Sequence, residues 1–149
     1  MVPGKYFDIY FPERLHEQFV IKQFAGIPTI IFEIYNETIN AYNSNALILC
    51  AIGLRTIIEA VCNHVKIEGE SLENKIDNLE KHHLITKELS TALQNCKFLG
   101  NDAVRNLVSP TKEELALSIE LLEGVLHSLF TIPFKHDDLK KRISKRMLD

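Results

Sequence analysis

Cysteine is scarce in this 149-residue sequence, and its three copies are widely spaced: Cys50, Cys62 and Cys96. The number is odd, and no two of them form a C-x-x-C pair. On one helix, Cys50 and Cys62 would lie about 18 Å apart, which is too far for a disulfide. We therefore expect three free thiols in a reducing cytosol, in a domain whose hydrophobic core needs no disulfides.

Long apolar runs are also missing. The longest, Ala46 to Leu54, stops at Arg55 after nine residues, which is about half of a membrane-spanning helix. The first residues, MVPGKYFDIYFPERLHEQF, show no basic stretch followed by an apolar run, so no signal peptide is expected there. The sequence predicts a cytoplasmic protein that has no membrane partner.

The chain lacks the strong positive charge of a protein that coats nucleic acid, because its formal net charge is −3. The charge is unevenly distributed, however. Residues 134–149 hold six Lys or Arg against three Asp, which gives +3 and leaves −6 for the rest of the chain. A solvated helix and a nucleic-acid contact would both account for this basic tail, and both alternatives stay open.

Motifs of the common enzyme classes are absent as well. The sequence contains no G-x-S-x-G, no P-loop and no dinucleotide-binding fingerprint. His82 and His83 are adjacent, but consecutive helical residues point about 100° apart, and no further metal-ligating cluster stands at the required spacing. We expect no metal and no other cofactor, and we interpret the two histidines as a solvated helix end.

Helical periodicity is what the sequence does contain. Apolar residues recur at helical spacing in four long segments and one short one, without a convincing strand pair or an internal repeat. The predicted fold class is all-α: an up-and-down bundle of four long helices plus a short one. We expect an extended N-terminal arm with packed aromatic residues over 1–26, the bundle over 27–132, and a basic C-terminal tail over 133–149.

The second long helix, predicted over residues 46–65, is apolar on nearly all sides. Such a pattern is typical of the central helix of a bundle. Arg55 and Glu59 stand at i, i+4 and are expected to form its one ion pair, partly buried. The helix before it has Pro28 in its first turn, where the missing N–H does no harm.

Capping signals mark the later helix starts. Ser71 opens the short helix and Thr86 the long helix that runs to about Arg105. Thr111 and Glu114 form a capping box at the start of the last bundle helix, which is expected to end at Pro133. Leu122 lies on the innermost line of that helix, and we expect it to be fully buried.

Three polar side chains line one face of the helix that starts at Thr86: Lys97, Asn101 and Arg105 stand at i, i+4 and i+8. Gly100 interrupts the same stretch, although glycine costs about 1 kcal/mol relative to alanine inside a helix. One explanation is architectural: Gly100 and Asn101 serve a close helix crossing, and Asp102 pairs with Arg105 at i, i+3. The other is a ligand, since Lys and Arg hold a phosphate by charge and hydrogen bonds.

Five pieces of the sequence, in order, resemble the DUF 4145 family, a branch of the HEPN superfamily of small helical bundles. They span residues 27–130 and read IPTIIFEIYNETINAY, GLRTIIEAVC, GESLENKIDNLEKHHLITKEL, FLGNDAVRN and the amphipathic helix that follows SPTKEE. The first 26 residues and the basic tail lie outside this resemblance. It implies a homodimer in a prokaryotic defence or stress context, whose partners are RNA or a larger defence-related protein.

In ribonuclease members of the superfamily, an arginine and a histidine at a groove between two protomers cleave RNA without a metal. Members similar to this chain carry the arginine three residues before a Gly-Asn pair and the histidine four residues after the Asn. Here Lys97 and Arg105 stand at those two positions. Arginine stays charged near pH 7, so it cannot replace the histidine as a proton acceptor.

The resemblance therefore implies a non-catalytic module in which Lys97, Asn101 and Arg105 bind RNA or another anion. Arg55, Glu59 and Gly100 are expected to be structural. The alternative is a metal-independent ribonuclease with an altered motif. In that case His64 or His127 would have to supply the imidazole from another helix, or a second protomer would.

Overall fold

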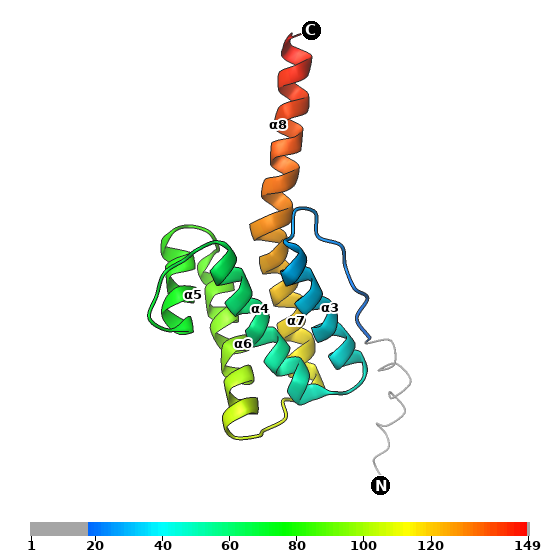
Figure 1. The fold of residues 1–149 in the computed structure, drawn as a ribbon, viewed down its shortest axis with the longest axis vertical. Coiled ribbons are helices and arrows are strands. Elements are labelled where there is room, and N and C mark those ends of the chain that lie inside the picture. Colours follow the sequence, from blue (N-terminus) through cyan, green and yellow to red (C-terminus); the bar gives the residue numbers. More distant parts are fainter. Residues whose placement is uncertain (1–17, 149) are drawn as a thin grey trace.

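The computed structural model describes residues 18–148, and every regular element within them is a helix. Figure 1 shows a helical body from which the last helix projects. The long helices of the body are α3 (Thr29–Asn43), α4 (Leu47–His64), α6 (Lys87–Arg105) and α7 (Lys112–Leu126), and α5 (Leu72–Lys81) is short. A π-helix, η2 (His127–Thr131), leads into α8 (Ile132–Leu148). The predicted all-α class is confirmed.

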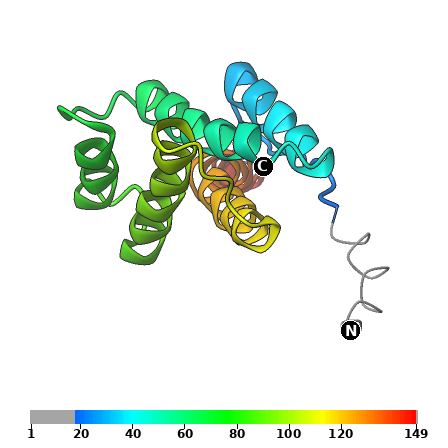
Figure 2. The same ribbon diagram turned by 90° about the horizontal axis from the view of Figure 1, so that it is seen from below.

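Helix α4 lies at the centre of the body, with α3 on one side and α6 on the other (Figures 1 and 2). It also packs against α7 and α5. Its buried side chains are Cys50, Ala51, Leu54, Ile57, Ile58, Val61 and Cys62. This burial explains why the α4 sequence is apolar on nearly every side.

Two helical stretches, α4 and the helix from Lys112 to Leu148, are long and apolar enough to cross a membrane by length and composition. That criterion is weak evidence, because a core helix of a soluble protein meets it as well. The burial of α4 among four other helices accounts for its composition without a membrane.

Capping side chains start three of the helices, as the sequence predicts. The hydroxyl of Thr111 accepts the backbone N–H of Glu114 at 3.0 Å, and the Glu114 carboxylate accepts that of Thr111 at 2.8 Å. The hydroxyls of Ser71 and Thr86 likewise each accept a backbone N–H three residues further on. Leu122 is only 2% exposed, so the predicted innermost line of α7 is confirmed.

Residues 18–26 run back along α3 without forming a helix or a strand (Figure 1). Two aromatic side chains hold this segment: Phe19 packs edge-on against Tyr42, and Phe24 packs edge-on against Tyr35. The Asn43 side chain also exchanges two hydrogen bonds of 2.9 Å with the Phe19 backbone. Residues 1–17, the rest of the predicted arm, lie outside the described residues.

Helix α7 carries a buried carboxylate, Glu123, whose side chain is 5% exposed. It accepts hydrogen bonds from Lys22 Nζ and from the Tyr35 hydroxyl, each at 2.8 Å. Burial, together with the bond to Glu123 and its negative charge, raises the pKa of Tyr35 well above its usual value. A buried charge is tolerated only when it is paired and hydrogen-bonded. These three groups therefore attach the N-terminal segment to α3 and α7.

Pro133 does not end the last helix of the body, and that prediction is wrong. Helices α7, η2 and α8 form one continuous helix from Lys112 to Leu148. Proline removes a backbone donor, and its ring clashes with the carbonyl four residues earlier. The wider π-turn of η2, which ends two residues before Pro133, makes room for the ring. The basic tail is thus a helix without buried side chains that projects from the body (Figure 1).

Candidate functional site

Helices α4 and α6 cross closely at Gly100, which is buried. A Cβ atom built on Gly100 would lie 2.7 Å from the Arg55 Cβ and 2.9 Å from the Ala51 carbonyl oxygen. Real Cβ atoms do not approach other atoms so closely. The glycine in the polar stretch is therefore required by the helix crossing, which is the architectural explanation of that residue.

Arg55 connects the helices around this crossing. Its Nε donates a hydrogen bond of 2.7 Å to the Asn101 Oδ1 on α6. Its guanidinium also pairs at 3.4 Å with Glu59, the i, i+4 partner expected from the sequence. Glu59 in turn lies 3.7 Å from the Lys75 ammonium on α5. Because these side chains are only partly buried, the network is accessible from solvent on one side.

A shallow hollow of about 270 Å³ lies beside the crossing. Its lining residues are Ile52, Arg55, Thr56, Asn101, Val104 and Arg105. Two of the three predicted anion-binding residues, Asn101 and Arg105, thus share one hollow with Arg55. Lys97 lies one turn earlier on α6, partly buried and outside that lining. Arg55, predicted as structural, contributes to the hollow as well.

Arg55 and Arg105 differ in whether their guanidinium N–H groups are available to bind a ligand. Arg55 is already engaged by Asn101 and Glu59. Arg105 is exposed, and in the described chain it forms no ion pair with Asp102, whose carboxylate instead accepts a 2.6 Å hydrogen bond from the Asn106 side chain. The guanidinium fork of Arg105 is therefore free to bind a carboxylate or a phosphate, which guanidinium groups do in a bidentate manner.

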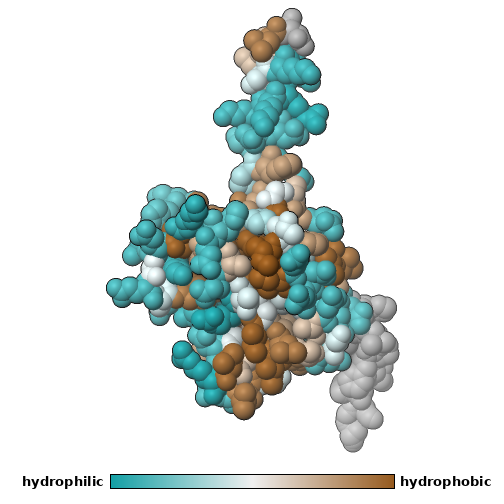
Figure 3. All heavy atoms as spheres, viewed as in Figure 1, coloured by the Kyte–Doolittle hydropathy of each residue, from teal (hydrophilic) through white to brown (hydrophobic). Residues whose placement is uncertain are grey.

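Exposed apolar side chains lie in the lining of this hollow and just beyond the end of α6. Val104, which lines the hollow, is 54% exposed, and Leu107 and Val108, which follow α6 in the sequence, are 75% and 46% exposed. Figure 3 shows apolar side chains gathered at this lower end of the body, where α6 ends. The hollow thus combines one available cationic group with an apolar rim, a combination that suits a ligand with anionic and flat apolar parts.

The histidines named as alternative catalytic residues lie elsewhere. His64 is nine residues beyond Arg55, about 14 Å along α4, and its ring packs against Phe130 with centroids 5.6 Å apart. His127 begins η2, three residues before Phe130. Figure 1 places η2 at the end of the body opposite to the C-terminal end of α6. Within one protomer, these two imidazoles are therefore remote from Arg105.

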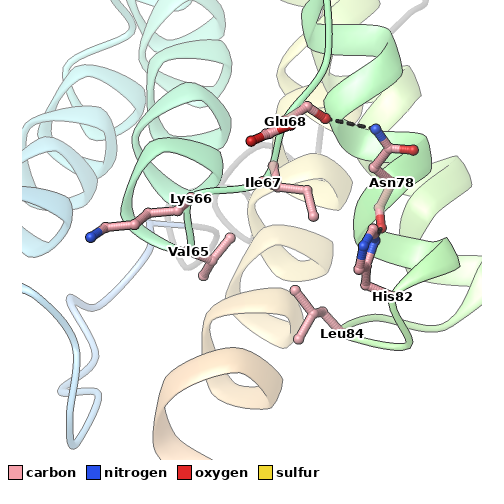
Figure 4. Close-up of a pocket in the computed structure, with 7 residues that line it drawn as sticks. All are labelled: Val65, Lys66, Ile67, Glu68, Asn78, His82 and Leu84. Carbon is pink, nitrogen blue, oxygen red and sulfur yellow. Dashed lines mark hydrogen bonds between the residues drawn. The ribbon is translucent and has the colours of Figure 1, made fainter.

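A larger hollow, of about 600 Å³, lies between the end of α4 and the end of α5 (Figure 4). The polar side chains of Asn78 and His82 in its lining form hydrogen bonds to the backbone of other lining residues. The Asn78 amide donates to the Glu68 carbonyl at 2.6 Å, and the His82 ring lies 2.8 Å from the Asn78 carbonyl. His83, the neighbour of His82, adopts a positive φ of 61° at the turn after α5. Among the described residues, no group of three His, Cys, Asp or Glu is placed to hold a metal ion.

The fold and site define a small helical protein with a basic hollow at a helix crossing. A family model described as a domain of unknown function (DUF4145) matches residues 36–145, and the chain belongs to this family. The match begins within α3 and extends through most of α8, so the basic helix that the sequence resemblance left out is largely inside it. No curated protein and no solved structure matches the chain.

Proposed function

We propose that this chain is a non-catalytic HEPN-like helical module that binds phosphate groups of RNA at the hollow between α4 and α6. The all-helical fold supports this proposal, because the sequence resemblance implies a HEPN-like helical bundle. The observation that carries the proposal is the exposed Arg105 beside Arg55 and Asn101 in one hollow. Lys97 adds a positive charge one turn away on the same helix.

The chemistry of these residues favours binding over cleavage. Attack by a 2′-hydroxyl requires a group that takes and returns a proton near pH 7. Arg105 remains protonated at that pH, whereas the family position would hold a histidine. A phosphate clamp requires only charge and hydrogen-bond donors, and both are present. Cleavage would need an imidazole from a second protomer, because His64 lies at the other end of α4.

The biological setting is proposed by analogy with the family resemblance alone. It comprises a homodimer, a cytoplasmic location, and a prokaryotic defence or stress context in which a larger protein is a further partner. Neither the apolar helix α4 nor the close approach at Gly100 offers a surface for this dimer, because both are filled within the chain, by neighbouring helices and by Arg55. A homodimer must therefore use another surface.

The proposal is tested with a fluorescent single-stranded RNA and a double variant, Lys97→Ala with Arg105→Ala. RNA affinity should fall, and the slope of log affinity against log salt should decrease by about 0.7 per lost phosphate contact. The matched control is Lys81→Ala with Lys87→Ala, which removes the same charge from exposed positions outside the lining of the hollow. An equal loss in the control variant, or no binding by wild type at low salt, would contradict the proposal.

A further inference from the structure

A row of residues, most of them exposed, follows one side of the continuous helix from Lys112 to Leu148. In α7, Leu117 is 63% and Leu121 is 44% exposed, whereas Leu115, Ile119 and Leu122 of the same helix face the core. The row consists of Leu117, Leu121, Gly124, Ser128, Ile132, His136, Leu139 and Ile143. Its steps of three and four residues keep these side chains on one face of a helix.

The π-helix η2 keeps the two halves of this row aligned. Alternating steps of four and three residues define a heptad seam. Between Ser128 and Ile132 the step is four where the alternation would require three, and a π-turn adds one residue at that place. The row therefore continues from α7 onto α8. From Leu117 to Ile143 it extends about 39 Å at 1.5 Å per residue.

Among the described residues, the apolar members of the row on α8 are not covered by other side chains. Ile132, Leu139 and Ile143 are 51%, 56% and 46% exposed. The side of α8 that Figure 3 shows is mainly hydrophilic along its middle, so the helix is amphipathic. Apolar side chains that repeat over several turns of a projecting helix are typical of a surface that packs against another helix.

The charge beside the row reverses along the helix. Apart from Glu123, which is buried and paired with Lys22, α7 carries three Glu and one Lys, which gives −2, whereas α8 carries six Lys or Arg and two Asp, which gives +4. Two of the α8 cations pair within the helix, Lys141 with Asp137 and Arg142 with Asp138. The remaining basic side chains of α8, which form no ion pair among the described residues, are Lys135, Lys140, Lys145 and Arg146.

We propose that this row binds a second copy of the chain, with the two long helices packed antiparallel. The reversal of charge along the helix favours a second copy of the chain as the partner and an antiparallel orientation of the two helices. Antiparallel packing places each acidic α7 against the basic α8 of its partner, whereas parallel packing would bring like charges together. With a twofold axis near Phe130, Leu121 packs against the partner's Leu139, and Leu117 packs against the partner's Ile143.

This interface deepens the proposed function, because it supplies the surface of the homodimer. Within the described chain the row on α7 stays exposed, since α7 uses its other side to pack on α3, α4 and α6. Figure 2 shows α7 open on the side away from α4. The apolar contacts would lie in the centre of the interface and the ion pairs along its edges, as in a coiled coil.

The first test is the mass of the protein in solution by light scattering. Wild type should have twice the 17.1 kDa chain mass at micromolar concentration. Leu139→Glu should be monomeric, because a carboxylate would be buried in the apolar seam. Leu49→Glu, at a site that is 64% exposed on α4, is the matched control and should remain dimeric. Circular dichroism should show unchanged helix content in both variants.

The second test fixes the orientation. Leu121→Cys combined with Leu139→Cys should give a disulfide-linked dimer on oxidation. Neither single variant should do so, because residue 121 lies about 27 Å from the partner's residue 121 in the antiparallel arrangement. The three native cysteines are buried and do not interfere. Cross-linking by a single variant would overturn the antiparallel arrangement.

The outcomes separate this interface from the proposed homodimer and from RNA binding. A dimer that persists in Leu139→Glu overturns this interface and leaves a homodimer through another surface. If wild type is a monomer by light scattering, both this interface and the proposed homodimer are wrong. RNA affinity at the α4–α6 hollow is measured independently, with the Lys97 and Arg105 variants, so loss of dimerisation does not decide it.

Discussion

The Nε of Arg55 donates a hydrogen bond to the Oδ1 of Asn101 at 2.7 Å. This bond joins the central helix α4 to α6, the helix that carries Lys97, Asn101 and Arg105 on one face. The two residues belong to separate family-like pieces of the sequence, GLRTIIEAVC and FLGNDAVRN. Asn101 is thereby occupied, whereas Arg105, one turn further along α6, remains exposed. Substitutions of Asn101 and of Arg105 should therefore change the stability of the protein by different amounts, although both residues lie on the same face of α6.

Asn101→Ala should destabilise the protein by about 1–2 kcal/mol, because it leaves a partly buried guanidinium N–H without its acceptor. Arg105→Ala should change the free energy of unfolding by less than about 0.5 kcal/mol. Urea melts of Asn101→Ala, Arg55→Ala and the double variant measure the coupling directly. Contacting residues couple by about 0.5–3 kcal/mol, so strictly additive effects would contradict the role assigned to this bond.

Gly100→Ala should destabilise the protein by about 1–3 kcal/mol, although alanine is the better helix former. The added methyl group would meet the Arg55 Cβ and the Ala51 carbonyl oxygen of α4. Gly124→Ala, measured in the monomeric Leu139→Glu background, is the matched control, because its Cβ would find its nearest neighbour within the chain, Leu89, only at 4.0 Å. That variant should gain up to about 1 kcal/mol in urea melts. Equal changes at both glycines would show that the close crossing is not what requires Gly100.

Features determined by neighbouring residues could be predicted from the sequence. The capping box of Thr111 and Glu114 is set by a spacing of three residues, and the Arg55–Glu59 pair by a spacing of four. The burial of Leu122 follows from helical periodicity, which identifies the apolar face of a helix. These predictions succeeded because each of them depends on a single helix.

Contacts between residues of different helices could not be predicted from the sequence. Periodicity does not tell which polar residue of α4 meets which residue of α6, so Asn101 could not be assigned to Arg55. Glu123 stands among apolar residues of α7 without any sequence signal that Lys22 and Tyr35 would neutralise and hydrogen-bond it. At Pro133, the rule that proline ends a helix was overridden by the π-turn before it.

Leu122→Ala should cost about 2–5 kcal/mol in the free energy of unfolding, because the side chain is 2% exposed in the core. Leu49→Ala serves as the control. Leu49 is 64% exposed, so its truncation should cost less than about 0.5 kcal/mol. Both values come from urea melts at one protein concentration. A loss below about 1 kcal/mol for Leu122→Ala would mean that this face of α7 is not the tightly packed one.

Stability should fall at alkaline pH, in part because of the buried thiols. Burial raises the pKa of Cys50 to about 12 and that of Cys62 to about 11. In the unfolded chain a thiol ionises near pH 8.5, so above that pH the unfolded state loses its proton first and is favoured. The contribution is thus fully present below about pH 8.5 and is lost as the pH rises toward 11.

Cys62→Ala isolates this effect from other groups that titrate in the same range. The alanine variant should be less stable than wild type at pH 7.5, and the difference between the two should shrink as the pH rises from 8 to 10.5. Urea melts at a series of pH values measure it. A difference that stays constant over this range would mean that Cys62 ionises equally well in the folded protein.

Arg105→His combined with Lys97→Arg places the family's histidine and arginine around Gly100 and Asn101. Position 105 is exposed, so an imidazole there should keep a pKa near its usual value of about 6.5 and act as a proton acceptor at pH 7. We expect this variant to cleave RNA slowly with a metal chelator present, at a rate that rises as the pH passes through about 6.5. Wild type should bind the same RNA without cutting it, since Arg105 holds its proton. The controls are the double variant with Asn101→Ala and a substrate with 2′-deoxy sugars, which lacks the attacking hydroxyl. If wild type itself cuts RNA without metal and Arg105→Ala abolishes that activity, the chain is an enzyme and the non-catalytic proposal is wrong.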